Sequence, residues 1–277
     1  MITRLLSALV LIVVLALPVA FGPAWVLLLL AMIVIPWCVY ELMHATLSKN
    51  ASALGYILMV GTVGYLWYSY QADFFLLCLF GAGIALSIII AGLYLFEKEM
   101  ATGRDVALAL SGIIYPIGLF SFWILLRNAP DGRFWMIFGL VCTFIADGGA
   151  YFAGRSLGKH KISPRLSPKK TVEGLVGGIA ASIIFGLLFA FSYPKLSDLI
   201  PYFEPFIRTY PVWLFIVLGF VIALLDLAGD LTASMFKREF GIKDFGNIIP
   251  GHGGMLDRMD GVIPVGAALY IILSFIN

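Results

Sequence analysis

Apolar runs of about 20 residues follow one another along almost the whole chain, and they restrict it to folds that can lie in a lipid bilayer. Apolar residues make up 61% of the 277 residues, and the mean hydropathy is +1.01. Runs between charged residues and Gly or Pro breaks predict an all-α, polytopic integral membrane protein with about nine transmembrane helices and a polar cavity open to the cytoplasm. The predicted spans are residues 5–20, 24–44, 53–70, 73–96, 105–126, 133–153, 172–192, 211–235 and 261–276.

The distribution of Lys and Arg supports nine spans and predicts their orientation. With nine spans, 14 of the 18 Lys and Arg residues fall on the side of the N-terminus. The other side receives Arg127, Arg133, Lys195 and Arg208. Cytoplasmic loops carry an excess of Lys and Arg, so the N-terminus and the polar loops 154–171 and 236–260 are expected in the cytoplasm.

The N-terminal apolar run and the rest of the composition argue against several other classes of protein. Residues 4–20 could imitate a signal peptide, but Pro23 leads directly into a second apolar run, which favours retained helices or one long broken segment. A net charge of +2 without a basic tail argues against a nucleic-acid partner. The three cysteines lie in apolar runs without paired spacing, which argues against a disulfide or a zinc site.

Charge returns abruptly between Ser234 and Asp260. Only 12% of the chain is charged, yet this window holds four basic side chains, one histidine and four carboxylates. Such a cluster beside lipid is costly and is typical of a functional site. The Gly-rich turn around His252 lets backbone N–H groups approach an anion, and Asp257 and Asp260 provide oxygen ligands for a cation such as Mg²⁺. N-terminal capping of the last helix is the alternative role for these two aspartates.

Two carboxylates, Asp226 and Asp230, interrupt an apolar helix four residues apart and therefore share one helix face. Each intramembrane carboxylate costs roughly 2.5–3.5 kcal/mol on insertion scales, so the pair requires a compensating partner. A bound metal or the nearby Lys237–Arg238 pair would provide the compensating positive charge. Alternatively, Asp226 pairs with a loop Arg or stays protonated.

The polar loop 154–171 is expected to continue the site. Thr171 is placed to cap the following helix with Glu173 in its first turn, which would orient backbone donors towards a phosphate. Asp147, near the end of its span, is a candidate contact to nucleotide or metal. The alternative is that this basic loop is only a topology signal or a contact to anionic lipid.

The charged window resembles the signature of the CTP:phosphatidate cytidylyltransferases, also called CDP-diacylglycerol synthases. The family pattern runs Ser-x-x-Lys-Arg, four residues, Lys-Asp, a small residue two further on, and Pro-x-His-Gly-Gly-x-x-Asp-Arg-x-Asp. The matching residues are Ser234, Lys237, Arg238, Lys243, Asp244, Gly246, Pro250, His252, Gly253, Gly254, Asp257, Arg258 and Asp260. Phe245 stands where bacterial members often carry Ser. The resemblance extends to Asp147, Gly154-Arg155 and Ser-Pro-x-Lys-Thr-x-Glu-Gly, with Lys170 rather than Lys169 at the fixed lysine position, and it is strong over about residues 140–276.

The resemblance implies transfer of CMP from CTP to phosphatidic acid, with Mg²⁺ as cofactor and CDP-diacylglycerol and pyrophosphate as products. It makes Asp230 and Asp257 metal ligands, with Asp226 as a further candidate, and leaves a second cation open. The catalytic candidates are Lys237, Arg238, His252 and Arg258. The substrate-binding candidates are Asp147, Lys170, Glu173, Ser234, Lys243, Asp244, Gly253, Gly254 and Asp260. A turn histidine with only a structural role is the alternative for His252.

The expected organisation is three consecutive parts: N-terminal helices at 1–100 that provide packing and dimer contacts, a middle segment at 101–132, and a catalytic region at 133–277. Members of the family suggest a homodimer in the bacterial inner membrane. A transporter of an anionic substrate is the alternative function. A CDP-alcohol phosphotransferase is disfavoured because its motif, Asp-Gly-x-x-Ala-Arg with two later aspartates, requires an Arg that the stretch beginning Asp147-Gly148-Gly149-Ala150-Tyr151 lacks at the required place.

Overall fold

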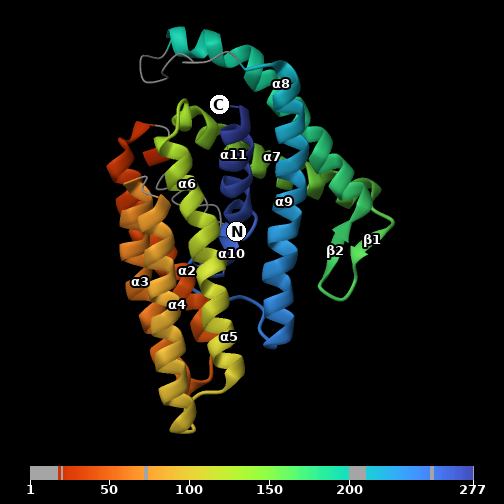
Figure 1. Cartoon of the computed structure of the whole chain (residues 1–277). Coiled ribbons are helices and arrows are strands. Elements are labelled where there is room, and N and C mark those ends of the chain that lie inside the picture. Colours follow the sequence, from red (N-terminus) through yellow and green to blue (C-terminus); the bar gives the residue numbers. More distant parts are fainter. Residues whose placement is uncertain (1–17, 20, 72–73, 200–209, 250–252, 277) are drawn as a thin grey trace. The chain divides into compact units, whose positions relative to one another are not determined.

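The computed structural model describes residues 18–19, 21–71, 74–199, 210–249 and 253–276, and it is helical apart from one short hairpin (Figure 1). The helices are α2 (Ala24–Thr46), α3 (Ser52–Tyr70), α4 (Phe74–Glu97), α5 (Gly103–Gly112), α6 (Leu119–Asn128), α7 (Gly132–Leu157), α8 (Val172–Leu199), α9 (Val212–Glu239), α10 (Leu256–Met259) and α11 (Val262–Ile276). The hairpin consists of β1 (Lys161–Ser163) and β2 (Ser167–Thr171), which pair antiparallel between α7 and α8.

The predicted fold class, an all-α polytopic membrane protein, is confirmed. Seven helical segments among the described residues are long and apolar enough to cross a membrane, and α11 is a shorter apolar helix. These eight segments coincide with eight of the predicted spans. The first predicted span, 5–20, lies almost entirely outside the described residues, so the count of nine stays a prediction.

The segment from α5 to α6 is one predicted span with a break at its centre. It begins at a capping box, in which Thr102 accepts from the backbone N–H of Asp105 and Asp105 accepts from that of Thr102. Residues 113–118 form a π-helical turn in which Tyr115 leaves helical geometry, at φ −128° and ψ 117°. The residue before a proline is disfavoured in the α conformation, so Pro116 accounts for this break.

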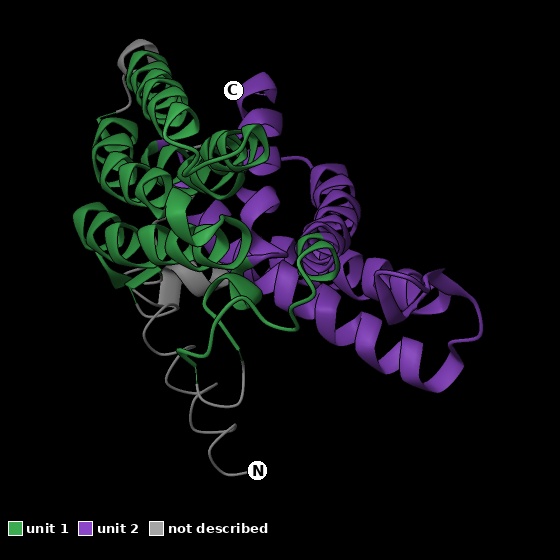
Figure 2. Cartoon of the chain, turned by 90° about the horizontal axis from the view of Figure 1, so that it is seen from below, with its two compact units in different colours: residues 1–128, 236–259 green, residues 129–235, 260–277 purple. Residues whose placement is uncertain are grey.

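The chain forms two compact units, each of which is discontinuous in sequence (Figure 2). The first unit comprises residues 1–128 and 236–259, and the second comprises 129–235 and 260–277. Helix α9 contributes to both. The three consecutive parts expected from the sequence stay a prediction, and each compact unit is described in its own right below.

In the first unit, α2 packs against α3, α5 and α6, and α3 also packs against α4. Leu28 and Ile35 of α2, Leu66 of α3 and Ile124 of α6 form its buried apolar cluster. The short helix α10 contacts α2. The last turn of α9 and the loop that follows it therefore belong to the same unit as the first described helix.

In the second unit, α7 and α8 form the most extensive helix pair and extend into the hairpin. Aromatic rings fill one end: Trp135 of α7 stacks on Phe215 of α9 at 5.4 Å between centroids, and Phe138 meets Phe189 of α8 at 5.7 Å. Towards the hairpin the helices approach more closely, because a Cβ at Gly177 would collide with Ala153. Small residues permit such close packing of membrane helices.

Large apolar side chains cover the outer surfaces of both units. In the first unit, Val60 is 75% exposed and Leu93 is 65% exposed. In the second unit, Phe152 is 70% exposed and Phe191 is 66% exposed. In water such surfaces would be a liability, but lipid solvates them. Together with the long apolar helices, they make the chain an integral membrane protein.

Candidate active site

Lys170 on β2 stands at the centre of a group of carboxylates in the second unit. Its Nζ lies 2.5 Å from Oδ2 of Asp230 on α9 and 3.7 Å from Oδ1 of Asp147 on α7. Burial by itself lowers the pKa of Lys170, but the carboxylates outweigh burial and the pKa lies above its usual value. The ammonium group therefore stays charged at neutral pH. The structure thus brings together three predicted site residues from three separate elements.

Asp226 belongs to the same group. It is buried, lies one helical turn before Asp230 on α9 and interacts electrostatically with Lys170. Gly261 packs against its carboxylate so closely that a Cβ there would collide with it. The prediction that Asp226 and Asp230 share one helix face is confirmed, since both act on the same ammonium group.

A cavity of about 640 Å³ lies within the second unit, among α7, the hairpin, α8 and α9. Its charged lining residues are Asp147, Arg155, Lys161, Lys169, Lys170 and Asp226. Arg155 follows Asp147 by eight residues on α7, which is about 12 Å of helical rise. The cavity therefore combines several cationic side chains, which suit phosphate groups, with carboxylates that suit a cation.

Local contacts shape the hairpin at the side of this cavity. The hydroxyl of Thr171 accepts from the backbone N–H of Gly174 at 3.1 Å, so the predicted cap of α8 is confirmed. Glu173 accepts from the backbone N–H groups of Lys159 and His160 and contacts Nδ1 of His160 at 2.6 Å. The carboxylate of Glu173 thus holds the start of the hairpin, and a contact of Glu173 to substrate stays a prediction.

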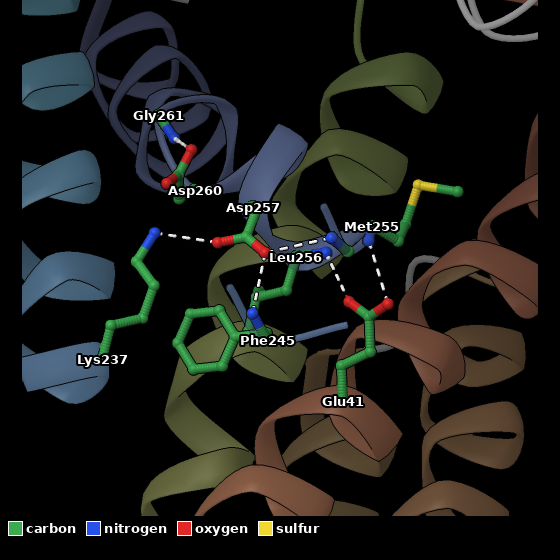
Figure 3. A network of polar contacts seen from close by, with 9 residues as sticks. Glu41, Lys237, Phe245, Met255, Leu256, Asp257, Asp260 and Gly261 are labelled. Carbon is green, nitrogen blue, oxygen red and sulfur yellow. Dashed lines mark hydrogen bonds and ion pairs between the residues drawn. The ribbon is translucent and has the colours of Figure 1, made fainter. Parts of the chain in front are cut away.

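Asp257 is the most enclosed carboxylate of the signature, with a side chain that is 2% exposed in the first unit. Its Oδ1 accepts from Nζ of Lys237 at 2.8 Å, and its Oδ2 accepts from the backbone N–H groups of Phe245 and Gly254 at 2.8 and 3.0 Å (Figure 3). Lys237 also lies 5.6 Å from the centroid of the Phe245 ring. The loop between α9 and α10, residues 240–255, is called the signature loop below, and its described part is folded around Asp257.

The remaining signature residues occupy varied positions. Arg238, Lys243, Asp244 and Arg258 are exposed, whereas Ser234 is buried on α9. Asp260 accepts from the backbone N–H of Gly261 at 3.0 Å in the second unit. Pro250 and His252 lie outside the described residues, so the role predicted for His252 stays a prediction.

The Gly-rich turn differs from the phosphate cradle that its sequence suggests. Gly253 has φ +86°, a conformation that favours glycine, as the sequence predicts for a tight turn. The N–H of Gly254, however, is bonded to Asp257, and the next two N–H groups are bonded to Glu41 of α2. These amides already hold carboxylates of the protein, so a phosphate contact at Gly254 stays a prediction.

Glu41 is the site residue that sequence reasoning missed. It is 3% exposed in an apolar predicted span, and it contacts residues more than 200 positions away. A carboxylate within an apolar run is itself a signal of function, and that signal could have drawn attention to Glu41.

The described residues fit the chemistry of a bound Mg²⁺ by their donors. Among them, no group of three or more His, Cys, Asp or Glu side chains is arranged to hold a metal. Mg²⁺ usually keeps several waters and takes only one or two carboxylates together with substrate phosphates, so such a group is not required. Asp230 and Asp257, which belong to different units, each pair with a lysine ammonium group, and the binding of Mg²⁺ by either aspartate stays a prediction.

Long apolar helices around a cavity of lysine, arginine and aspartate side chains define a polytopic membrane protein whose site suits anionic groups. Comparison with known proteins then identifies the family to which the chain belongs. The chain belongs to the cytidylyltransferase family, whose model matches residues 2–276. The family resemblance predicted from the signature is thereby confirmed.

Individual relatives agree. A phosphatidate cytidylyltransferase of Staphylococcus aureus (strain COL) is 31% identical over 270 residues, which cover 98% of this chain and 98% of that protein. A phosphatidate cytidylyltransferase of Staphylococcus saprophyticus is 36% identical over 190 residues, or 69% of this chain and 67% of the relative. The similarity to the first of these includes the N-terminal helices, which the motif alone did not cover.

Proposed function

We propose that the chain is a phosphatidate cytidylyltransferase that transfers CMP from CTP to phosphatidic acid, giving CDP-diacylglycerol and pyrophosphate. Family membership and the names of the relatives support this assignment. The observation that carries it is the cavity around Lys170, where cationic side chains meet carboxylates inside a membrane protein. A lipid phosphate and a nucleotide triphosphate both need such an environment.

The reaction brings two polyanions together. An oxygen of the phosphatidate phosphate forms a bond to the α-phosphorus of CTP, while the bond from that phosphorus to the oxygen bridging the β-phosphate breaks and pyrophosphate leaves. Phosphatidate is already an anionic nucleophile, so catalysis is mainly positioning and charge neutralisation. In this account Lys170, Lys237, Arg238, Lys243 and Arg258 hold phosphates, and His252 donates a hydrogen bond to one.

Mg²⁺ is part of the proposal. Asp230 and Asp257 would hold it, with Asp226 as a further ligand or as part of a second cation site. When bound, the ion would neutralise charge on the nucleotide phosphates and polarise the α-phosphate. The cluster around Lys170 supports this, because the carboxyl groups of Asp147, Asp226 and Asp230 gather around one ammonium group, and carboxylate oxygens are the ligands that Mg²⁺ prefers.

We further propose that the protein lies in the bacterial inner membrane with its N-terminus and both polar loops in the cytoplasm. The excess of Lys and Arg on that side supports the orientation. CTP would then enter from the cytoplasm, and the acyl chains would stay in the bilayer. Assembly as a homodimer is a proposal that rests on the family resemblance.

Isotopic labelling tests the function directly. Purified protein in detergent would receive phosphatidate and CTP labelled at the α-phosphate or, separately, at the γ-phosphate. The proposal requires the α-label in the lipid fraction and the γ-label in pyrophosphate. Label that stays in CTP, together with flux of an anionic solute into proteoliposomes, would instead identify a transporter.

A further inference from the structure

Glu41 on α2 binds the backbone of the signature loop in the first unit. Its Oε1 accepts from the N–H of Met255 at 3.0 Å, and its Oε2 accepts from the N–H of Leu256 at 2.8 Å (Figure 3). Nε1 of Trp37 donates to Oε1 at 3.1 Å from the preceding turn of α2. Both carboxylate oxygens of this buried side chain are therefore used by the protein.

These contacts are continuous with those of Asp257. Three successive backbone N–H groups, those of Gly254, Met255 and Leu256, are bonded to two carboxylates. Asp257 takes the first and Glu41 takes the next two. One of the two hydrogen bonds that orient Oδ2 of Asp257, the one from Gly254, therefore comes from a segment that Glu41 holds.

Two glycines of the loop, Gly246 and Gly254, lie against the carboxylate of Glu41. A Cβ at Gly254 would lie 2.5 Å from Oε2 of Glu41, and a Cβ at Gly246 would also collide with the carboxylate. These two glycines come from opposite ends of the described loop, before and after residues 250–252. Glu41 therefore contacts both ends, and the chain is shaped to admit its carboxylate.

Burying a carboxylate in an apolar helix is unfavourable unless it is fully hydrogen-bonded. An apolar residue would pack at this position of α2 without that cost, and a glutamine could accept at only one of its two terminal atoms. Two facing N–H donors in the loop specifically match a carboxylate. A residue that served only to pack α2 would not need this match.

We propose that Glu41 is a positioning residue for cytidylyl transfer, which acts by holding the Gly254–Leu256 backbone so that Asp257 keeps its orientation towards Lys237. This inference rests on the proposed function of the chain. Among the described residues, the hydrogen-bond partners of Glu41 are Trp37 and the N–H groups of Met255 and Leu256. Its influence on catalysis passes through these two loop amides and the neighbouring Gly254.

The test compares Glu41→Gln with Trp37→Phe. Glu41→Gln keeps the size of the side chain but turns an NH₂ group towards one of the loop N–H donors. Trp37→Phe removes a donor to the same carboxylate and leaves both loop contacts in place. For Glu41→Gln we expect kcat to fall about tenfold or more while KM for CTP changes less than about threefold, and we expect Glu41→Asp to recover part of the loss. Trp37→Phe should stay within about threefold of the parent enzyme.

Hydrogen exchange measured by mass spectrometry provides a readout that does not depend on activity. In Glu41→Gln, peptides that contain Met255 and Leu256 should exchange faster, while peptides from α3 and from α8 keep the parent rate. Faster exchange throughout the protein, or unchanged exchange in the loop peptides with parent kcat, would overturn the proposal. A parent protein without cytidylyl transfer would refute the function alone, since the exchange experiment would still report whether Glu41 holds the loop.

Discussion

The ammonium group of Lys237 lies 2.8 Å from the carboxylate of Asp257, and the two side chains are 14% and 2% exposed. Both residues belong to the signature and are 20 positions apart in the chain. A buried ion pair is expensive to break, because removal of one partner leaves the other charge without compensation. The ion pair between Lys237 and Asp257 therefore links the two ends of the loop.

Asp257→Asn is expected to reduce cytidylyl transfer by about a hundredfold or more, because it removes the charge that holds Lys237 and the proposed cation. Expression and membrane insertion should stay close to those of the parent, although thermal stability should fall because Lys237 loses its partner. Glu239→Gln is the control: it removes an exposed carboxylate from the end of α9, the helix that carries Lys237, where an ion pair contributes little. Near-parental turnover of Asp257→Asn at ordinary Mg²⁺ would remove Asp257 from the site.

Lys170→Met should lower kcat/KM for CTP by about a hundredfold, because it leaves Asp147, Asp226 and Asp230 without their shared cation and removes a proposed phosphate contact. Arg165→Met, in the turn of the same hairpin, removes an equal charge that is exposed and does not line the cavity. Steady-state kinetics of both variants decide the matter. Equal losses would mean that the net charge of the hairpin, rather than the position of Lys170, is what counts.

Asp230→Ala and Asp226→Ala separate the two carboxylates of α9. Asp230 contacts Lys170 directly, whereas Asp226 is buried about 6 Å further along the helix axis by helical rise. We expect Asp230→Ala to abolish transfer, and Asp226→Ala to weaken transfer less while it lowers thermal stability or disturbs a secondary ion. Activity titrations with Mg²⁺ give the apparent affinity of each variant. A larger loss in Asp226→Ala would show that the metal was assigned to the wrong carboxylate and that Asp226, rather than Asp230, is the ligand.

The parts of this site that the sequence predicted are local in the chain or carry unusual charge. Thr171 caps α8 through a residue three positions away, and Asp226 and Asp230 share a face because of helical spacing alone. Lys170 was singled out from Lys169 by its position in the family motif, and the structure places it among the carboxylates.

The parts that the sequence could not give depend on pairing across long separations. Glu41 meets Met255 from 214 residues away, and no periodicity predicts such a contact. The Gly-rich turn showed that N–H donors would be accessible, but not that Asp257 and Glu41 would occupy them. The β1–β2 hairpin was likewise missed, because its short polar strands have no alternating apolar pattern.

The orientation in the membrane is tested by cysteine labelling with a membrane-impermeant reagent. A cysteine in place of Ser163, in β1, should react from the cytoplasmic side. One in place of Ser197, whose side chain lies outside the described part of the structure, should react from the opposite side. The reverse pattern would overturn the arrangement of nine spans.

Product balance in purified protein tests metal-dependent transfer of CMP to phosphatidate most directly. CDP-diacylglycerol and pyrophosphate would be quantified after addition of CTP and phosphatidate, first with Mg²⁺, then after chelation, and again after Mg²⁺ is restored. We predict equimolar products that appear only when both substrates and Mg²⁺ are present, and that return when the ion is restored. Absence of CDP-diacylglycerol with all components present would rule out cytidylyl transfer to phosphatidate, and turnover unchanged by chelation would rule out its dependence on Mg²⁺.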